Sequence, residues 1–307
     1  MDYFIKNIGR FFSESRKGAD TQRFLFKSVL GYCLLILIFS GCAYEAPIPG
    51  ETQTIIFLGH TYQKRDRMDR RLEKVNYKQY DQIWLGGDMC SETTEEFSTL
   101  KYLNRHFRLG DPRTHWAVGN HDVRNGNTEW ITGYTGRDLF YTATDQGLTV
   151  LVLNTNFEQP DCALLQEQYD LMTMVLDTIE ASSHLVLLTH HCIWGDAVVG
   201  QDMWATANGN KPFWKSLCQD GSEFMPDILP RLKAVQARGV QVICLAGDFG
   251  QRVKSFEYRS AEGIWYLGCG LNKGLSNDID PEDQAMLLTF DPVQKNLDWE
   301  FVSVEAL

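Results

Sequence analysis

Short apolar runs rich in β-branched and aromatic residues recur along the chain, and segments with helical spacing of apolar positions separate several of them. We predict strands at residues 54–58, 82–85, 115–118, 148–154, 185–188 and 241–245. We predict helices at residues 65–76, 94–107, 164–179 and 227–238. Strands that alternate with helices in this way are typical of an α/β fold.

Beyond residue 253 the pattern changes to strands and turns, with strands predicted at residues 255–258, 263–267, 285–290 and 297–301. We expect these strands to form a second sheet that closes a single domain. The segment 193–226 is longer than an ordinary connection and carries Trp194, Trp204 and Trp214. Its tryptophans either pin the segment to the core or stack on a ligand, and a polysaccharide-binding module is a third reading that depends on this segment alone.

The N-terminus has the order of an export signal. Six basic side chains precede the apolar run 29–39, which ends in Ser40-Gly41-Cys42. This arrangement resembles a bacterial lipoprotein signal, which implies a lipid on Cys42, a tether at 42–53 and a folded domain at 54–307. The alternative is a retained membrane anchor, because 28–44 reaches the lower limit of roughly 17 residues for a spanning helix. Either way, we expect attachment to a bacterial membrane, facing the periplasm or the exterior.

The charge and the cysteines exclude two classes of function. Residues 1–41 carry six basic and three acidic side chains, which leaves 23 basic against 37 acidic residues and a net charge of −14. Such a surface repels nucleic-acid backbones, so no nucleic-acid partner is expected. The eight cysteines include no Cys-x-x-Cys spacing, which argues against cysteine-bound zinc and leaves disulfide pairing open.

Polar side chains follow five of the predicted strands. The segments are Gly59-His60-Thr61-Tyr62, Gly87-Asp88, Gly119-Asn120-His121-Asp122, His190-His191 and Gly247-Asp248-Phe249-Gly250. Ligands of α/β folds bind beyond the carboxyl ends of the strands, so these segments predict one shared site. Divalent metal ions accept Asp, Asn and His together, and the sequence therefore predicts a metal centre.

The order of these segments resembles the calcineurin-like metallophosphoesterase superfamily over essentially all of residues 54–301, and Asn154 followed by a helix with Gln168 is similar to a further part of that pattern. The resemblance implies a four-layer α/β/β/α sandwich with two mixed sheets flanked by helices. It also implies one or two ions of Mn, Fe or Zn, of mixed valence in some members. The implied reaction is hydrolysis of a small phosphomonoester or phosphodiester by metal-activated water.

Carried over position by position, the resemblance makes Asp88, Asn120 and His190 metal ligands. It makes His121 the catalytic imidazole, with Asp122 orienting it. His191 is then expected either to have a structural role or to contact a metal ligand without binding the metal.

The first and last segments depart from the family pattern. The family has Asp-x-His where this chain has His60-Thr61-Tyr62, and Gly-His-x-His where this chain has Gly247 to Gly250. Asp248 is expected to complete one metal site with Asp88, Asn120 and His190. The other site would keep His60 and Asp88, and Tyr62 is either a ligand there or a hydrogen-bonding wall residue. Replacement ligands for the side chain that Gly250 lacks are Gln251, Asp196 or Asp202. A single-metal site is one alternative, and a non-catalytic ligand-binding lipoprotein on the same scaffold is another.

Overall fold

The computed structural model describes residues 49–157, 161–209, 224–271 and 280–307. The predicted signal at 1–41, Cys42 and most of the tether lie outside the described residues, as does Trp214. In the part of the chain that is described, no helix is long and apolar enough to cross a membrane.

Five strands form the first sheet, in the order β11-β10-β1-β2-β3. Their bounds are β1 (Gln53–Leu58), β2 (Gln82–Leu85), β3 (Thr114–Trp116), β10 (Gln284–Asp291) and β11 (Asn296–Ser303). Strand β2 pairs in parallel with β1 and β3, whereas β10 pairs antiparallel with β1 and β11. The sheet is therefore mixed.

Six strands form the second sheet, in the order β4-β5-β6-β7-β9-β8. Their bounds are β4 (Tyr141–Asp145), β5 (Leu148–Val152), β6 (His184–Thr189), β7 (Gln241–Ala246), β8 (Ser255–Arg259) and β9 (Trp265–Cys269). The pairs from β5 to β9 are parallel and the two outer pairs are antiparallel, so this sheet is mixed too.

The expectation that the C-terminal strands form a sheet of their own is wrong. Strands β8 and β9 extend the second sheet beyond β7, and β10 and β11 join the first sheet beside β1. Without β10, one edge of the buried strand β1 would have unpaired N–H and C=O groups, which is costly. The last strands therefore complete both sheets.

Three of the four predicted helices are confirmed, with slightly shifted ends: α3 (Phe97–Phe107), α6 (Cys162–Thr178) and α8 (Leu229–Ala237). Shorter helices and helical turns complete the set: η1 (Leu72–Lys74), η2 (Tyr77–Gln79), α4 (Asn120–Val123), α5 (Thr128–Thr135), η3 (Gly195–Ala197), α7 (Met203–Thr206), η4 (Phe224–Ile228) and η5 (Val304–Ala306).

The helix predicted at 65–76 is wrong, because this segment is a loop followed by the turns η1 and η2. Met68 and Leu72 have helical spacing and are buried, but the backbone N–H of Asp69 donates to Thr61 O at 2.8 Å. The Asp69 carboxylate accepts from Arg71 N and Nε, at 2.8 and 3.0 Å. These bonds replace the helical ones, so tertiary structure overrides the periodicity.

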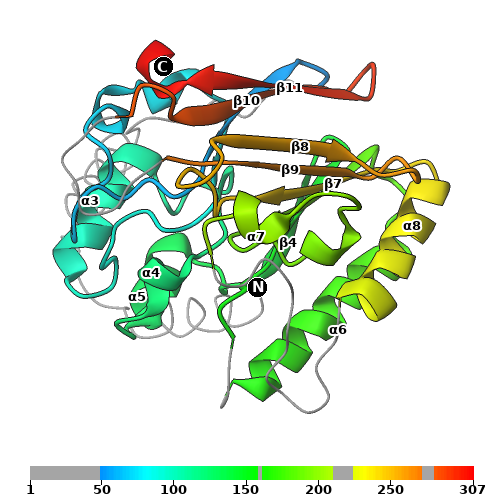
Figure 1. Cartoon of the computed structure of the whole chain (residues 1–307), viewed down its shortest axis with the longest axis horizontal. Coiled ribbons are helices and arrows are strands. Elements are labelled where there is room, and N and C mark those ends of the chain that lie inside the picture. The colour runs from blue at the N-terminus through cyan, green and yellow to red at the C-terminus, as the bar shows by residue number, and fades with distance from the viewer. Residues whose placement is uncertain (1–48, 158–160, 210–223, 272–279) are drawn as a thin grey trace, which may run out of the picture. The chain divides into compact units, whose positions relative to one another are not determined.

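Three hydrophobic layers separate the sheets and helices. One lies between the sheets and contains Phe57 and Trp84 from the first sheet with Val186 and Leu245 from the second. Another packs α6 and α8 against the second sheet, and these helices lie side by side in Figure 1. The third packs α3 against the first sheet. This is the α/β/β/α sandwich with two mixed sheets that the sequence predicts.

The two sheets touch backbone to backbone at their carboxyl ends. Gly86 follows β2 and Gly247 follows β7. A Cβ added to Gly247 would lie 2.1 Å from Gly86 O and 2.6 Å from Gly86 Cα. Only glycine allows this approach, and it brings the polar ends of both sheets together.

This contact predicts a marked loss of stability in Gly247→Ala. The added methyl group meets backbone that has no rotamer to change, so we expect the free energy of unfolding to fall by about 1–3 kcal/mol. Gly133→Ala in α5 is the control, because its Cβ meets nothing within 4 Å. It should gain about 0.5–1 kcal/mol of helix propensity. Denaturant unfolding measures both, and a Gly247→Ala protein as stable as the parent contradicts the packing.

Candidate metal centre

A pocket of about 350 Å³ lies where the strands of both sheets end. Among the described residues, six segments line it, through His60, Tyr62, Asp88, Asn120, His121, His191, Asn208, Gly209, Asp248 and Gln251. Six of the eight predicted site residues follow strands of the first sheet, and His190 and Asp248 follow strands of the second. The sheets thus bring together residues that are far apart in the sequence.

Asp88 is the centre of this group. Its Oδ2 lies 3.5 Å from His190 Nε2, 3.8 Å from His60 Nε2 and 3.9 Å from His121 Nε2. Asp88 and His60 both have left-handed backbone conformations, with φ of 56° and 49°. Such values are uncommon outside glycine and often mark functional sites.

Backbone carbonyl groups orient the three imidazoles. His60 Nδ1 lies 3.0 Å from Leu271 O, His121 Nδ1 3.0 Å from Ser91 O, and His190 Nδ1 2.7 Å from Gly86 O. A carbonyl oxygen only accepts hydrogen bonds, so each Nδ1 must carry the proton. Each neutral ring therefore presents the lone pair of Nε2 towards Asp88, which is the usual arrangement of a histidine metal ligand.

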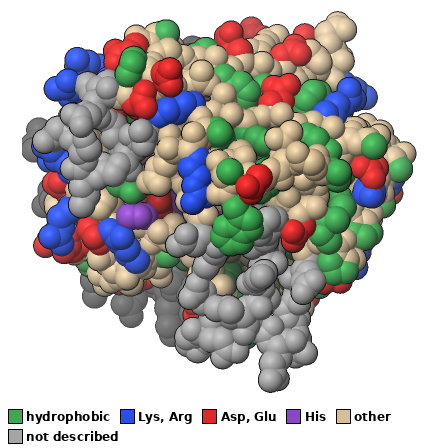
Figure 2. Space-filling model, viewed as in Figure 1, with side chains coloured by type: hydrophobic (Ala, Val, Ile, Leu, Met, Phe, Trp, Pro, Cys, Tyr) green, Lys and Arg blue, Asp and Glu red, His purple; other side chains and the backbone are tan. Residues whose placement is uncertain are grey.

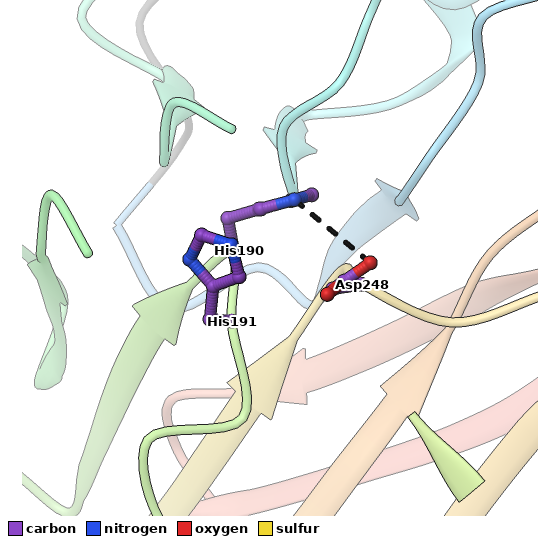
Figure 3. A group of neighbouring side chains, drawn as sticks. All are labelled: His190, His191 and Asp248. Atoms are coloured by element: carbon purple, nitrogen blue, oxygen red, sulfur yellow. Dashed lines mark ion pairs between the residues drawn. The ribbon is translucent and has the colours of Figure 1, made fainter. Parts of the chain in front are cut away.

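His190 is the strongest single indication of a metal. The residue is fully buried, and its Nε2 has no hydrogen-bond partner among the described residues. Asp248 Oδ1 lies 4.0 Å from this nitrogen, and ligand atoms of His190, His191 and Asp248 all lie within 4.8 Å of one another. Figure 3 shows His190 directed towards Asp248, with the ring of His191 beside it. A buried nitrogen without a partner is costly, and a cation would satisfy it.

The charges around Asp88 also favour a cation. Burial raises the pKa of the Asp88 carboxyl, but the imidazoles of His190, His60 and His121 outweigh it, so the pKa lies below its ordinary value. Burial lowers the pKa of His190, but the carboxylates of Asp88 and Asp248 outweigh it and raise the value. In the absence of a metal, a proton on His190 therefore balances part of the negative charge of the two carboxylates. A bound metal ion would take over this positive charge.

Asp248 depends on a loop that the sequence does not predict as part of the site. Burial raises the pKa of Asp248, and the backbone N–H of Gly209 opposes this by donating to its carboxylate. A Cβ on Gly209 would lie 1.9 Å from Asp248 Oδ2, so the loop approaches closely. Asn208 Nδ2 donates to Phe249 O at 2.6 Å, and Asn208 Oδ1 accepts from Gln251 N at 2.7 Å. In the sequence, the Asn208-Gly209 pair within the long segment 193–226 is the feature that could have indicated this loop as part of the site.

Asp122 does not orient His121, so this part of the sequence-based prediction is wrong. Its carboxylate is buried and accepts from the backbone N–H of Asp88, Met89 and Gly119 at 2.8, 3.0 and 2.8 Å. Thr93 Oγ1 donates to it as well, at 2.6 Å. Asp122 therefore holds the backbone of the loop that carries Asp88. The carbonyl of Ser91 orients His121 instead.

Tyr62 forms an aromatic wall of the pocket. Its ring stacks on His121 with centroids 4.6 Å apart, and it lies 4.8 Å from the ring of His60. Burial, with a smaller contribution from Asp88, raises the pKa of Tyr62 to about 12. The phenol therefore stays protonated near neutral pH, which favours the wall role over that of a phenolate ligand.

Comparison with solved structures gives the fold an independent check. A dimetal phosphatase from Danio rerio has a TM-score of 0.51 and 11% sequence identity, and the match covers 84% of this chain and 100% of that chain. The chain therefore shares the fold of this dimetal phosphatase, with two mixed sheets flanked by helices. A weaker likeness, with a TM-score of 0.41 and 13% identity, covers 73% of this chain and 92% of a phosphopantetheinyl hydrolase from Mycobacterium tuberculosis. No family model and no curated protein matches the sequence.

At such low identity the likeness concerns the fold, and the chemistry has to follow from the residues. The supporting pair Asn154 and Gln168 is in place: Gln168 is buried, and its Oε1 accepts from Asn154 N at 2.7 Å. Asn120 is exposed at the start of α4 and lines the pocket. The structure therefore brings all the predicted ligands to one place.

Two of the three replacement ligands lie away from the pocket lining. Asp202 caps α7, where its carboxylate accepts from Trp204 N and Ala205 N. Asp196 is exposed in η3, whereas Gln251 does line the pocket. Of the tryptophans, Trp194 is buried in the core and Trp204 is 51% exposed.

The contacts of Asp122 predict that Asp122→Asn destabilises the protein. One amide oxygen cannot satisfy all five donors, which include Trp116 Nε1 at 3.3 Å, and the amide nitrogen would face N–H groups. We therefore expect a loss of about 2–4 kcal/mol in the free energy of unfolding. Asp196→Asn is the matched control at an exposed position and should change stability by less than about 0.5 kcal/mol. Equal stability of the two variants would show that Asp122 has no structural role.

The contacts of His190 and Tyr62 predict that metal binding depends on His190 and not on the Tyr62 hydroxyl. His190→Ala removes a buried ligand nitrogen, so we expect metal affinity to fall by more than about 10-fold. Tyr62→Phe keeps the aromatic wall and removes only a protonated hydroxyl, so the affinity should stay within about 2-fold of the parent. Titration with Mn²⁺ and Zn²⁺ measures both variants. A loss in Tyr62→Phe as large as that in His190→Ala would make Tyr62 a ligand.

Proposed function

We propose that the chain is a metal-dependent hydrolase of phosphate esters. The observation that carries this proposal is the convergence of three imidazole Nε2 atoms on Asp88 Oδ2, with the buried His190 Nε2 lacking a hydrogen-bond partner among the described residues. A nitrogen and carboxylate cluster of this kind is stable only with a cation or with added protons. The fold of a dimetal phosphatase supports the same chemistry.

The residues present fit a Mn, Fe or Zn ion. Asp88, Asn120, His190 and Asp248 would hold one ion, and His60 would contribute to a second ion beside Asp88. Such an ion supplies an activated water near neutral pH and neutralises charge on phosphoryl oxygens. His191 is a further candidate metal ligand, because its ring lies close to His190 and Asp248.

His121 is the candidate acid of the reaction. Its Nδ1 is held by Ser91 O, and its side chain is 19% exposed at the pocket. When the ring carries a second proton, that proton is on Nε2, which can donate it to the leaving oxygen of an ester or to a phosphoryl oxygen. The ring is fixed between the Ser91 carbonyl and the stacked face of Tyr62, so the proton is held at a defined position.

A non-catalytic binding protein is the second candidate, and Gly250 is the observation that favours it. This position has φ of +112°, and an added Cβ would lie 2.4 Å from the backbone of Leu271. No side chain fits there, so the structure provides no ligand at the place of the family's last histidine. One of the two metal sites consequently has fewer ligands than the other.

Export and lipid anchoring remain part of the proposal. The N-terminal sequence with Cys42 supports them, and so does Cys162, which is disulfide-bonded. Disulfides persist mainly in oxidising compartments. We propose a cell-envelope location, with the lipid on Cys42 or an N-terminal anchor as the membrane attachment.

The substrate class that fits best is a small phosphoester. A pocket of about 350 Å³ is near the lower end of the usual range for small-molecule sites. The acidic balance of the chain, with a formal net charge of −11, disfavours long polyanions.

Metal analysis combined with a phosphoester panel tests this function. The purified chain, reconstituted with Mn, Fe or Zn, should contain one or two ions and hydrolyse a phosphomonoester or a phosphodiester. Asn120→Ala and His121→Ala should each lower kcat/KM by at least about 100-fold, because they remove a ligand and the acid.

Matched controls are Asn125→Ala and His106→Ala, which change the same residue types outside the pocket lining. Both should retain activity. A chain that takes up no stoichiometric metal and hydrolyses nothing, but binds a phosphoester, would support the non-catalytic alternative. Equal rates in Asn120→Ala and the parent would remove the metal-ligand assignment.

A further inference from the structure

A second pocket lies beside the metal centre and is lined by basic side chains. It has a volume of about 360 Å³, and the loop and turn that follow Tyr62 line it, through Gln63, Lys64, Arg67, Met68, Arg70 and Glu73. Figure 2 shows a histidine at the surface with Lys and Arg side chains close beside it. Three basic residues against one acidic residue give the lining a net positive charge.

Two of the cations that line this pocket have no partner among the described residues, whereas neighbouring cations are paired. Arg65 pairs with Glu95, and Arg67 pairs with Asp66 at 3.6 Å. The side chains of Lys64 and Arg70 make no hydrogen bond or ion pair with any described residue, and both are exposed.

The acidic member of the lining does not cancel these cations. The Glu73 carboxylate accepts from the Tyr102 hydroxyl at 2.7 Å, and the Arg67 guanidinium lies over the Tyr102 ring, 4.4 Å from its centroid. These contacts hold Glu73 and Arg67 in place. Lys64 and Arg70 are therefore the groups free to bind an anion.

The basic pocket and the metal pocket share a wall. Tyr62 lines the metal pocket and Met68 lines the basic one, and the two residues form an antiparallel β-bridge. Ser91 N donates to Lys64 O at 3.0 Å, and Ser91 O holds His121 Nδ1 at 3.0 Å. A single residue thus connects the backbone of Lys64 to the candidate acid.

We propose that the basic pocket binds a second phosphate of the substrate, so that the preferred substrates carry two phosphate groups. This inference rests on the proposed function, because the metal centre would act on the first phosphate. Unpaired Lys and Arg side chains around a pocket form charge-assisted hydrogen bonds with phosphate oxygens. The chain as a whole is acidic, so cations without a partner among the described residues stand out beside the metal centre. Binding of a phosphate group would explain why Lys64 and Arg70 lie there.

The test compares two double variants with the same change in net charge. Lys64→Gln with Arg70→Gln removes the two unpaired cations of the pocket. Lys78→Gln with Arg105→Gln removes an exposed Lys and an exposed Arg that do not line it. A difference between the variants therefore reports the pocket and not the overall charge.

The first measurement is the binding of inorganic pyrophosphate to the purified full-length chain by calorimetry. A chelator is present, which removes the contribution of bound metal. Loss of two charge-assisted contacts should weaken pyrophosphate binding by about 10-fold or more in the Lys64 and Arg70 variant, and by less than about 2-fold in the control. Equal weakening in both variants, or no binding to the parent chain, would overturn the proposal.

The second measurement is the ratio of kcat/KM for a sugar bisphosphate to that for the matching sugar monophosphate. The ratio should fall about 10-fold in the Lys64 and Arg70 variant, through KM of the bisphosphate, and stay unchanged in the control. An unchanged ratio in both variants would overturn the second-phosphate site. If neither ester is hydrolysed, the proposed function fails, whereas the pyrophosphate measurement still decides the binding site.

Discussion

The contact between Gly86 and Gly247 is the constraint on which the site depends. It lets the carboxyl ends of β2 and β7 approach until backbone meets backbone, with no side chain between them. Gly86 O also accepts the hydrogen bond from His190 Nδ1. One close contact therefore joins the sheets, places Asp88 near Asp248, and turns His190 Nε2 towards both. A larger residue at either glycine would separate the strand ends that supply the ligands.

Three carboxylates are buried near this junction, and different groups offset the cost of burial for each of them. Asp122 is compensated by backbone N–H groups and the Thr93 hydroxyl, which makes it part of the scaffold. Asp88 is compensated by imidazoles, whose attraction lowers its pKa against the effect of burial. Burial raises the pKa of Asp248, and the imidazoles of His190 and His60 offset this effect only in part. The deficit in positive charge therefore lies between Asp88 and Asp248, where His190 Nε2 also lacks a hydrogen-bond partner among the described residues.

The sequence predicted the layers and the identity of the strand-end residues because both depend on local patterns. Runs such as Ile55 to Leu58 are apolar at every position because alternate side chains enter different cores. The sequence could not predict the partner of Asp122, because an acid beside a histidine in the chain gives no information on which N–H groups surround it in space. The helix predicted at 65–76 failed for the same reason, since Asp69 bonds to Thr61 and Arg71. Local spacing indicates an element, whereas tertiary hydrogen bonds decide it.

The exchange of a carboxylate and an imidazole between the first and last segments now has a structural explanation. Burial raises the pKa of Asp248, and the nearby imidazoles of His190 and His60 oppose this effect, so the first and last segments face the same space. Placing the imidazole on the first segment and the carboxylate on the last therefore keeps one donor of each kind at the centre. At position 250 no side chain replaces the missing ligand, because the backbone of Gly250 packs against Leu271. Leu271 O is also the group that orients His60. A side chain at position 250 would displace that carbonyl, so the contact that positions His60 also excludes a ligand at position 250.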